Sequence, residues 1–133
     1  MGAAMFFPTL CLALAIYHEA RNQPIEGQLA VAEVILNRVE SPAYPDTVCA
    51  VIAQPRQFAW VGQAGPVREA EAWNTARLIA QAVLADPEGT LPGTGATHFH
   101  EISARPSWAA RLLPVGQIGD HAFYAMADTT EDD

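Results

Sequence analysis

The 133-residue chain has no lysine, only two cysteines, and no apolar run long enough to cross a bilayer as a helix. All seven basic residues are arginine, and fifteen acidic residues bring the formal net charge to −8. Because an acidic surface repels nucleic acid and anionic lipid, we expect neither a nucleic-acid partner nor stable membrane insertion. Half of the residues are hydrophobic, which is enough for one core and one domain.

The two cysteines, Cys11 and Cys49, each lie inside an apolar stretch. Because an unpaired cysteine packs as a small hydrophobic residue, we expect two buried free thiols rather than a disulfide. Their spacing from the histidines does not match a compact zinc site, so we expect no bound metal there.

The N-terminal stretch from Ala3 to Tyr17 is uncharged and apolar, like the core of a secretion signal. A secretion signal carries basic residues before its apolar core, whereas the first basic residue here is His18 or Arg21. We therefore expect this stretch to form a buried helix and not a leader.

The spacing of apolar residues and prolines predicts four helices. The first covers Leu10 to Ala20 after Thr9 as N-cap, and the second runs from Pro24 to about Val39. A short helix is expected over Val48 to Ala53, and the longest from Pro66 to about Ala85.

Short strands are expected in the last third of the chain. The runs Ala96 to Glu101 and His121 to Met126 mix aromatic and polar residues, as half-buried strands do. Between them, Arg105 to Leu113 is expected to form a loop or a short helix. The predicted fold class is thus α+β, mainly α, with one domain over residues 1–127 and a small β ribbon. Residues 128–133 are expected to be a disordered acidic tail.

Glu19 closes the first predicted helix. Partial burial and the negative end of the helix dipole both favour its neutral form, so we expect a raised pKa for this carboxyl group. A carboxylic acid that keeps its proton near neutral pH is what glycoside cleavage requires.

A series of short motifs runs along most of the chain. It consists of Glu19-Ala20-Arg21, Gly27-Gln28, Ala30-Val31-Ala32, Asn37-Arg38-Val39, Tyr44-Pro45-Asp46-Thr47-Val48-Cys49, Gln57-Phe58 with Trp60, Gly95-Ala96-Thr97-His98-Phe99 and Gly119-Asp120-His121-Ala122-Phe123-Tyr124. In this order, over roughly residues 10–126, the series resembles the cell wall hydrolase family that includes the spore-cortex-lytic enzymes.

The resemblance implies a lysozyme-like domain, related to lytic transglycosylases, that acts on the glycan strands of peptidoglycan. The family's catalytic glutamate falls on Glu19. Such an enzyme can work with one acid and no cofactor, because a hydroxyl group of the muramic acid itself attacks and closes a 1,6-anhydro ring. If water attacks instead, the base could be Glu33, on the expected polar side of the second helix, or Glu101 or Asp120.

Further residues in or near these motifs are candidates for substrate binding. They are Arg21, Asn37, Phe58, Trp60, His98, His121 and Tyr124. Phe58 and Trp60 could stack on sugar rings or merely cover the core. Asn37 could contact sugar or orient Glu19.

Two other functions stay open on the sequence alone. His98 and His100 alternate on one strand and, with His121, could bind a metal, as in a metal-dependent wall peptidase or amidase. A non-catalytic glycan-binding module is the other. As an enzyme, the chain would be a monomer made in the cytoplasm and acting in the periplasm or wall. The sequence is compatible with a phage-type endolysin that passes through a holin. It is equally compatible with a bacterial enzyme that uses another export route.

Overall fold

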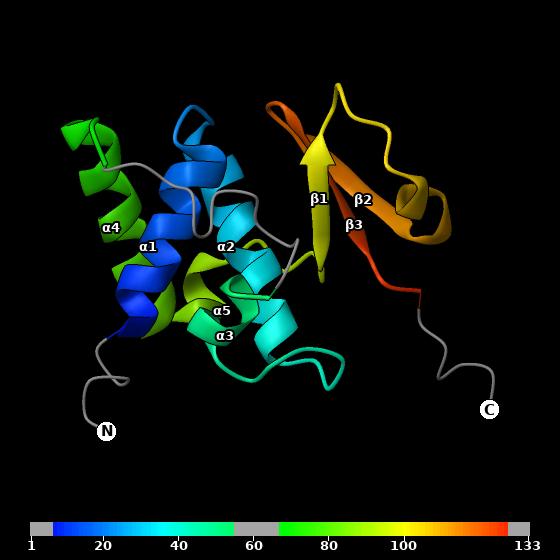
Figure 1. The fold of residues 1–133 in the computed structure, drawn as a ribbon, viewed down its shortest axis with the longest axis horizontal. Helices are drawn as coiled ribbons and strands as arrows, with labels where there is room; N and C mark the ends of the chain where they lie inside the picture. The colour runs from blue at the N-terminus through cyan, green and yellow to red at the C-terminus, as the bar shows by residue number, and fades with distance from the viewer. Residues whose placement is uncertain (1–6, 55–66, 128–133) are drawn as a thin grey trace.

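The computed structural model describes residues 7–54 and 67–127. In chain order the elements are α1 (Phe7–Ala20), α2 (Ile25–Val39), α3 (Val48–Ile52), α4 (Ala70–Ala85), α5 (Pro87–Thr90), β1 (His98–Glu101), the 3₁₀ helix η2 (Ser107–Arg111), β2 (Leu113–Ile118) and β3 (His121–Ala125). Figure 1 shows a helical body with a three-stranded sheet beside α2, on the side away from α4. The predicted α+β, mainly α class is confirmed, whereas the predicted tail lies outside the described residues.

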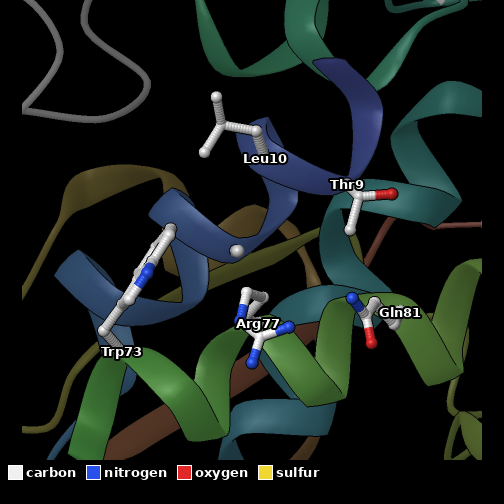
Figure 2. Close-up of a pocket in the computed structure, with 6 residues that line it drawn as sticks. Thr9, Leu10, Trp73, Arg77 and Gln81 are labelled. Atoms are coloured by element: carbon white, nitrogen blue, oxygen red, sulfur yellow. The ribbon is translucent and has the colours of Figure 1, made fainter. Parts of the chain in front are cut away.

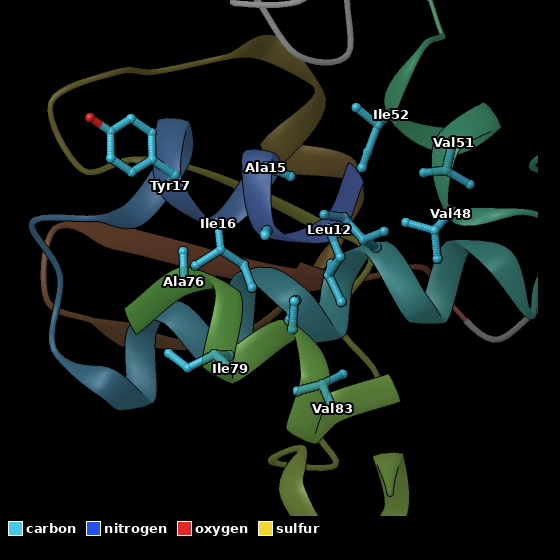
Figure 3. Close-up of a cluster of buried hydrophobic side chains, with 14 residues drawn as sticks. Leu12, Ala15, Ile16, Tyr17, Val48, Val51, Ile52, Ala76, Ile79 and Val83 are labelled. Atoms are coloured by element: carbon cyan, nitrogen blue, oxygen red, sulfur yellow. The ribbon is translucent and has the colours of Figure 1, made fainter. Parts of the chain in front are cut away.

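Helix α1 lies in the middle of the helical body because it is apolar on nearly every side. Leu12, Ala15 and Ile16 are fully buried and pack against α3 and α4 (Figure 3). A second cluster joins the end of α1 and one face of α2 to the sheet, through Ala20 and Phe123 among others. The predicted buried helix is confirmed for its described part, but α1 already includes Phe7, so the prediction of Thr9 as its N-cap is wrong. No helix within residues 7–54 and 67–127 is both long and apolar enough to cross a membrane.

Several helix ends follow local hydrogen bonds. The Thr47 hydroxyl accepts from the Ala50 amide and begins α3, which ends at Ile52. Helix α4 begins at Ala70 and not at Pro66 as predicted, and the residues just before it donate to the Tyr17 hydroxyl. The short α5 was not predicted; it begins where the Asp86 carboxylate accepts from an amide in the next turn.

The sheet is antiparallel in the order β1-β3-β2. The two predicted strand regions form β1 and β3, but the third strand, β2, was not predicted. Its side chains are mostly exposed, and a bulge between Pro114 and Gly116 breaks the alternation that identifies a strand. The turn between β2 and β3 contains Gly119 with φ of 56°, a conformation that favours glycine.

Cys11 of α1 and Cys49 of α3 form a disulfide, so the expectation of two free thiols is wrong. The Cα atoms lie 5.4 Å apart, within the usual range for a disulfide. Packing of α1 on α3 brings the two cysteines together, which an apolar pattern on each segment alone does not reveal. The bond ties α1 to α3 across 38 residues of sequence.

Candidate active site

Glu19 lies one residue before the end of α1, where the two buried clusters meet. The preceding Tyr17 is 3% exposed and belongs to the helical cluster, and the following Ala20 is 2% exposed and packs with the sheet. The Glu19 side chain itself is half-buried. Its backbone is therefore held on both sides, and its side chain is partly shielded from water.

Arg21 connects the end of α1 to the beginning of α4. Its Nε donates to Oε2 of Glu69 at 2.7 Å, and its guanidinium lies 4.6 Å from the centre of the Tyr17 ring. The Tyr17 hydroxyl in turn accepts from the amides of Arg68 and Glu69, both at 3.1 Å. These contacts fix the helix end that carries Glu19, and Glu69 already balances the charge of Arg21.

Glu33 is buried, so the expectation that it lies on the polar side of α2 is wrong. Its side chain is 2% exposed, and its carboxylate accepts from the amides of Gly93 and Thr94 at 2.7 and 2.9 Å and from the Thr94 hydroxyl at 2.7 Å. A carboxylate enclosed and engaged in this way is not available as a base for water. Its role is to hold the segment that leads into β1.

Asn37 and Arg38, one turn further along α2, hold the same segment. Asn37 Nδ2 donates to the Ala96 carbonyl at 2.8 Å, and Arg38 Nε donates to the Thr97 carbonyl at 2.7 Å. The side-chain amide of Asn37, predicted to bind substrate, thus already has a backbone partner. Helix α2 positions the start of β1 through a row of polar side chains.

His98, His100, Trp108 and Tyr124 form one cluster, here called the aromatic face. His98 and Tyr124 are register partners in β1 and β3, and the Trp108 ring of η2 lies 5.1 Å from His98 and 5.6 Å from both His100 and Tyr124. The aromatic face brings together two predicted binding residues. Trp108 was not among the predicted residues; an aromatic residue just after Pro106, between two predicted strands, is the signal that could have identified it.

Hydrogen bonds fix the histidine rings of the aromatic face. His100 Nδ1 lies 2.7 Å from the Glu101 carbonyl oxygen, which can only accept, so Nδ1 carries a proton, and Nε2 lies 3.0 Å from the Tyr124 hydroxyl. His98 Nδ1 lies 2.9 Å from the Thr97 hydroxyl. Burial, and then the positive charge of Arg38, lower the pKa of His98.

His121 lies on the opposite face of the sheet and points into the helical body. It is 3% exposed, and its ring centroid lies 5.0 Å from that of Phe99 and 6.1 Å from that of Phe123. Its Nδ1 is buried with no hydrogen-bond partner among the described residues. Burial lowers the pKa of His121, and the nearby carboxylates of Glu101 and Asp120 oppose this effect only in part.

The three histidines proposed as metal ligands, His98, His100 and His121, do not lie together. His98 and His100 share one face of β1, as predicted, but His121 is on the other face. Within residues 7–54 and 67–127, no group of three or more histidine, cysteine or acidic side chains is placed to hold a metal ion. The metal-dependent alternative therefore has no support in the geometry.

The remaining candidates are either exposed or outside the described residues. Glu101 and Asp120 are exposed at the same end of the sheet, where Asp120 exchanges hydrogen bonds with the Gln23 side chain at 2.9 and 3.2 Å. Phe58 and Trp60 lie outside the described residues.

Comparisons with known proteins agree with this architecture. The spore cortex-lytic enzyme of Oceanobacillus iheyensis is 40% identical over 114 residues, which cover 84% of this chain and 39% of that enzyme. That of Bacillus subtilis is 38% identical over 113 residues, 84% of this chain and 35% of that enzyme. The chain thus spans between a third and two fifths of the length of these relatives.

Solved structures match over nearly the whole chain. The catalytic domain of the germination-specific lytic transglycosylase SleB from Bacillus anthracis superimposes with a TM-score of 0.73 at 31% identity, covering 90% of this chain and 94% of that domain. The catalytic domain of the Bacillus cereus SleB protein matches with a TM-score of 0.69 at 32% identity, covering 88% of each chain. These matches confirm the predicted lysozyme-like fold class. Since the cell wall hydrolase family profile also matches residues 22–124, the chain belongs to the cell wall hydrolase family.

Proposed function

We propose that the chain cleaves the glycan strands of peptidoglycan, with Glu19 as the acid that protonates the glycosidic oxygen. The observation that carries this proposal is the match at 31% identity to nearly all of a lytic transglycosylase catalytic domain. The position of Glu19 supports it, because a half-buried carboxyl group at a fixed helix end can keep a proton and deliver it to a bound strand.

One carboxyl group is enough for the reaction. Glu19 gives its proton to the leaving oxygen as the glycosidic bond breaks, and the 6-hydroxyl of the same muramic acid bonds to the sugar carbon and returns its proton to Glu19. The products are a 1,6-anhydro end and a free sugar hydroxyl, so neither water nor a second base takes part. The engagement of Glu33 by its three hydrogen bonds fits a mechanism without that residue.

The aromatic face is the part of the sheet best suited to bind sugar. Its rings can cover the apolar faces of a sugar, and the Tyr124 hydroxyl can bond to a sugar hydroxyl. Asn37 acts on this surface through the backbone that it holds, and Arg21 acts on the end of α1 in the same way. Direct contacts of Phe58 and Trp60 with sugar stay predictions, whereas the buried His121 is not placed to touch sugar.

The place of action that fits this chemistry is the cell wall, reached by a monomer made in the cytoplasm. Disulfides form and persist in oxidising compartments, so the Cys11–Cys49 bond favours a protein that completes folding after export. Release through a holin and another export route both satisfy this condition.

The test compares Glu19→Gln with Glu26→Gln on purified peptidoglycan. Glu26 is exposed in the first turn of α2, so its amide variant is a matched control for the loss of one charge. We expect Glu19→Gln to lower turnover by about 10²-fold to 10⁴-fold and the control to keep full activity. Mass spectrometry of the products identifies the bond.

Anhydro-muramyl ends would establish transglycosylation, and reducing muramic ends would establish hydrolysis by the same glycosidase. Cut peptides, or full activity of Glu19→Gln, would overturn the proposal. A wild-type protein that binds peptidoglycan without cutting it would identify a binding module instead.

A further inference from the structure

The Tyr17 side chain connects the last turn of α1 to the residues just before α4. Tyr17 is 3% exposed, and its hydroxyl oxygen accepts from the backbone amides of Arg68 and Glu69, both at 3.1 Å. Glu69 is the N-cap of α4, and its own side chain makes no capping hydrogen bond. The amides that lead into α4 therefore depend on a hydroxyl group of another helix.

Arg21 strengthens the same connection from the residue that follows α1. Its Nη1 donates at 3.2 Å to the Tyr17 carbonyl, which is one of the four carbonyls at the end of a helix that lack a partner within the helix. Its Nε donates to Oε2 of Glu69 at 2.7 Å, and its guanidinium lies 4.6 Å from the centre of the Tyr17 ring. The contacts of Tyr17 and Arg21 with Arg68 and Glu69 are here called the α1–α4 anchor.

The α1–α4 anchor lies on the side of α1 that faces α4, away from the side that carries Glu19. A helix turns by about 100° per residue, so Tyr17 is rotated by about 200° from Glu19. The Trp73 ring of α4 lies against α1 (Figure 2) and meets the Tyr17 ring edge-on, with 6.0 Å between the ring centroids. The anchor can therefore fix the backbone of Glu19 without touching a substrate bound at its carboxyl group.

We propose that Tyr17 is a positioning residue for Glu19. Its hydroxyl group, together with Arg21, holds the last turn of α1 against the beginning of α4, so that the acid stays aligned with the bond that it cleaves. The proposal rests on the proposed function, because it concerns the rate at which Glu19 delivers its proton. Since the anchor does not touch the substrate, its loss should lower kcat and leave KM unchanged.

The test measures kcat and KM on purified peptidoglycan for Tyr17→Phe, which removes only the hydroxyl group. Thr47→Ala is the matched control, because the Thr47 hydroxyl also accepts from a backbone amide at the beginning of a helix. That helix, α3, is tied to Cys11, about two turns before Glu19. We expect Tyr17→Phe to lower kcat about tenfold with KM within about twofold, and Thr47→Ala to keep the wild-type kcat, although both variants should lower the urea midpoint.

A second variant tests whether the effect passes through the anchor. Glu69→Gln removes the charged partner of Arg21 at a side chain that is 55% exposed, so the variant should fold. It should also lower kcat, and the double variant with Tyr17→Phe should lose no more than about twofold beyond Tyr17→Phe alone, because both changes open one anchor. The proposal is overturned by an unchanged kcat, by a rise in KM, by losses that multiply, or by equal losses of kcat in Tyr17→Phe and Thr47→Ala.

Amide hydrogen exchange separates this proposal from the proposed function, because it requires no cleavage. In Tyr17→Phe the Arg68 amide, which loses its acceptor, should exchange about tenfold faster. The amides of Glu19 and Ala20 should accelerate with it, whereas that of Leu12, earlier in α1, should keep the wild-type rate. If the wild type cuts no glycan, the proposed function fails and these rates still decide whether Tyr17 holds the end of α1. Unchanged exchange at Glu19 and Ala20 would overturn the proposal.

Discussion

Removing the Cys11–Cys49 disulfide measures how strongly α1, the helix that carries Glu19, is held in place. The bond closes a loop of 38 residues. In the chain-entropy model a loop of that length stabilises the fold by about 4 kcal/mol at 25 °C. Domains of this size have a total stability of about 5–15 kcal/mol, so the double variant Cys11→Ala/Cys49→Ala should still fold but with a large part of its stability lost.

The assay is urea unfolding followed by circular dichroism. With a slope of about 2 kcal/mol per molar urea, the loss should lower the unfolding midpoint by about 2 M, and thermal unfolding should shift by on the order of 10 °C. Wild-type protein in reductant should match the double variant, whose own midpoint should not respond to reductant. Alanine is preferred to serine because it leaves no hydroxyl group among apolar neighbours.

Two outcomes would refute this reasoning. Thiol titration of the unfolded, unreduced wild type should find no free thiol, so two reactive thiols would show that Cys11 and Cys49 are not bonded. Equal midpoints with and without reductant would show that the bond, although formed, does not hold α1 against α3.

Three further predictions concern charge. Glu33→Gln should lower the free energy of unfolding by about 3 kcal/mol, because the amide cannot accept all three hydrogen bonds that the carboxylate accepts. The exposed control Glu40→Gln should change it by less than about 0.5 kcal/mol, and similar losses for the two variants in denaturant titrations would show that Glu33 does not hold residues 93 and 94. Burial holds the pKa of His121 below the usual 6.5, so the unfolded chain binds more protons and stability should fall as pH drops below about 6.5. His121→Phe should reduce this loss of stability, which urea titrations at pH 5, 6 and 7 would measure. An unchanged dependence of the free energy of unfolding on pH would contradict the prediction. Finally, activity on purified walls should rise as salt is added up to about 0.15 M, because salt screens the repulsion between the acidic protein and the acidic wall polymer. A steep fall in activity from the lowest salt concentration upward would contradict this prediction.

Local sequence patterns predicted the helical part of the fold well. The apolar stretch before Glu19 and the regular spacing in α2 reflect burial that each helix needs in any arrangement, so periodicity was sufficient. The β2 strand was missed because its side chains are exposed and its backbone is bulged, which removes the alternation that burial imposes.

The site was predictable only in part, because its geometry depends on contacts between distant segments. The placement of Glu33 under residues 93 and 94 requires the fold, and its sequence neighbours give no sign of it. Likewise, alternation predicted that His98 and His100 share a face, but only the register of β1 with β3 shows that His121 lies on the other. Charge and burial at such positions are properties of the packed structure.

The way α1 is anchored fits the proposal that Glu19 acts as a single acid. The disulfide at Cys11 ties the helix to α3, the Tyr17 hydroxyl holds the residues that begin α4, and Ala20 packs with Phe123 of the sheet. An error of about 1 Å in the position of a catalytic group can cost about 10²-fold in rate, and an enzyme without a second carboxylate has nothing to compensate for it. Under the proposed function, the described part of α1 is the rigid support that holds the proton donor.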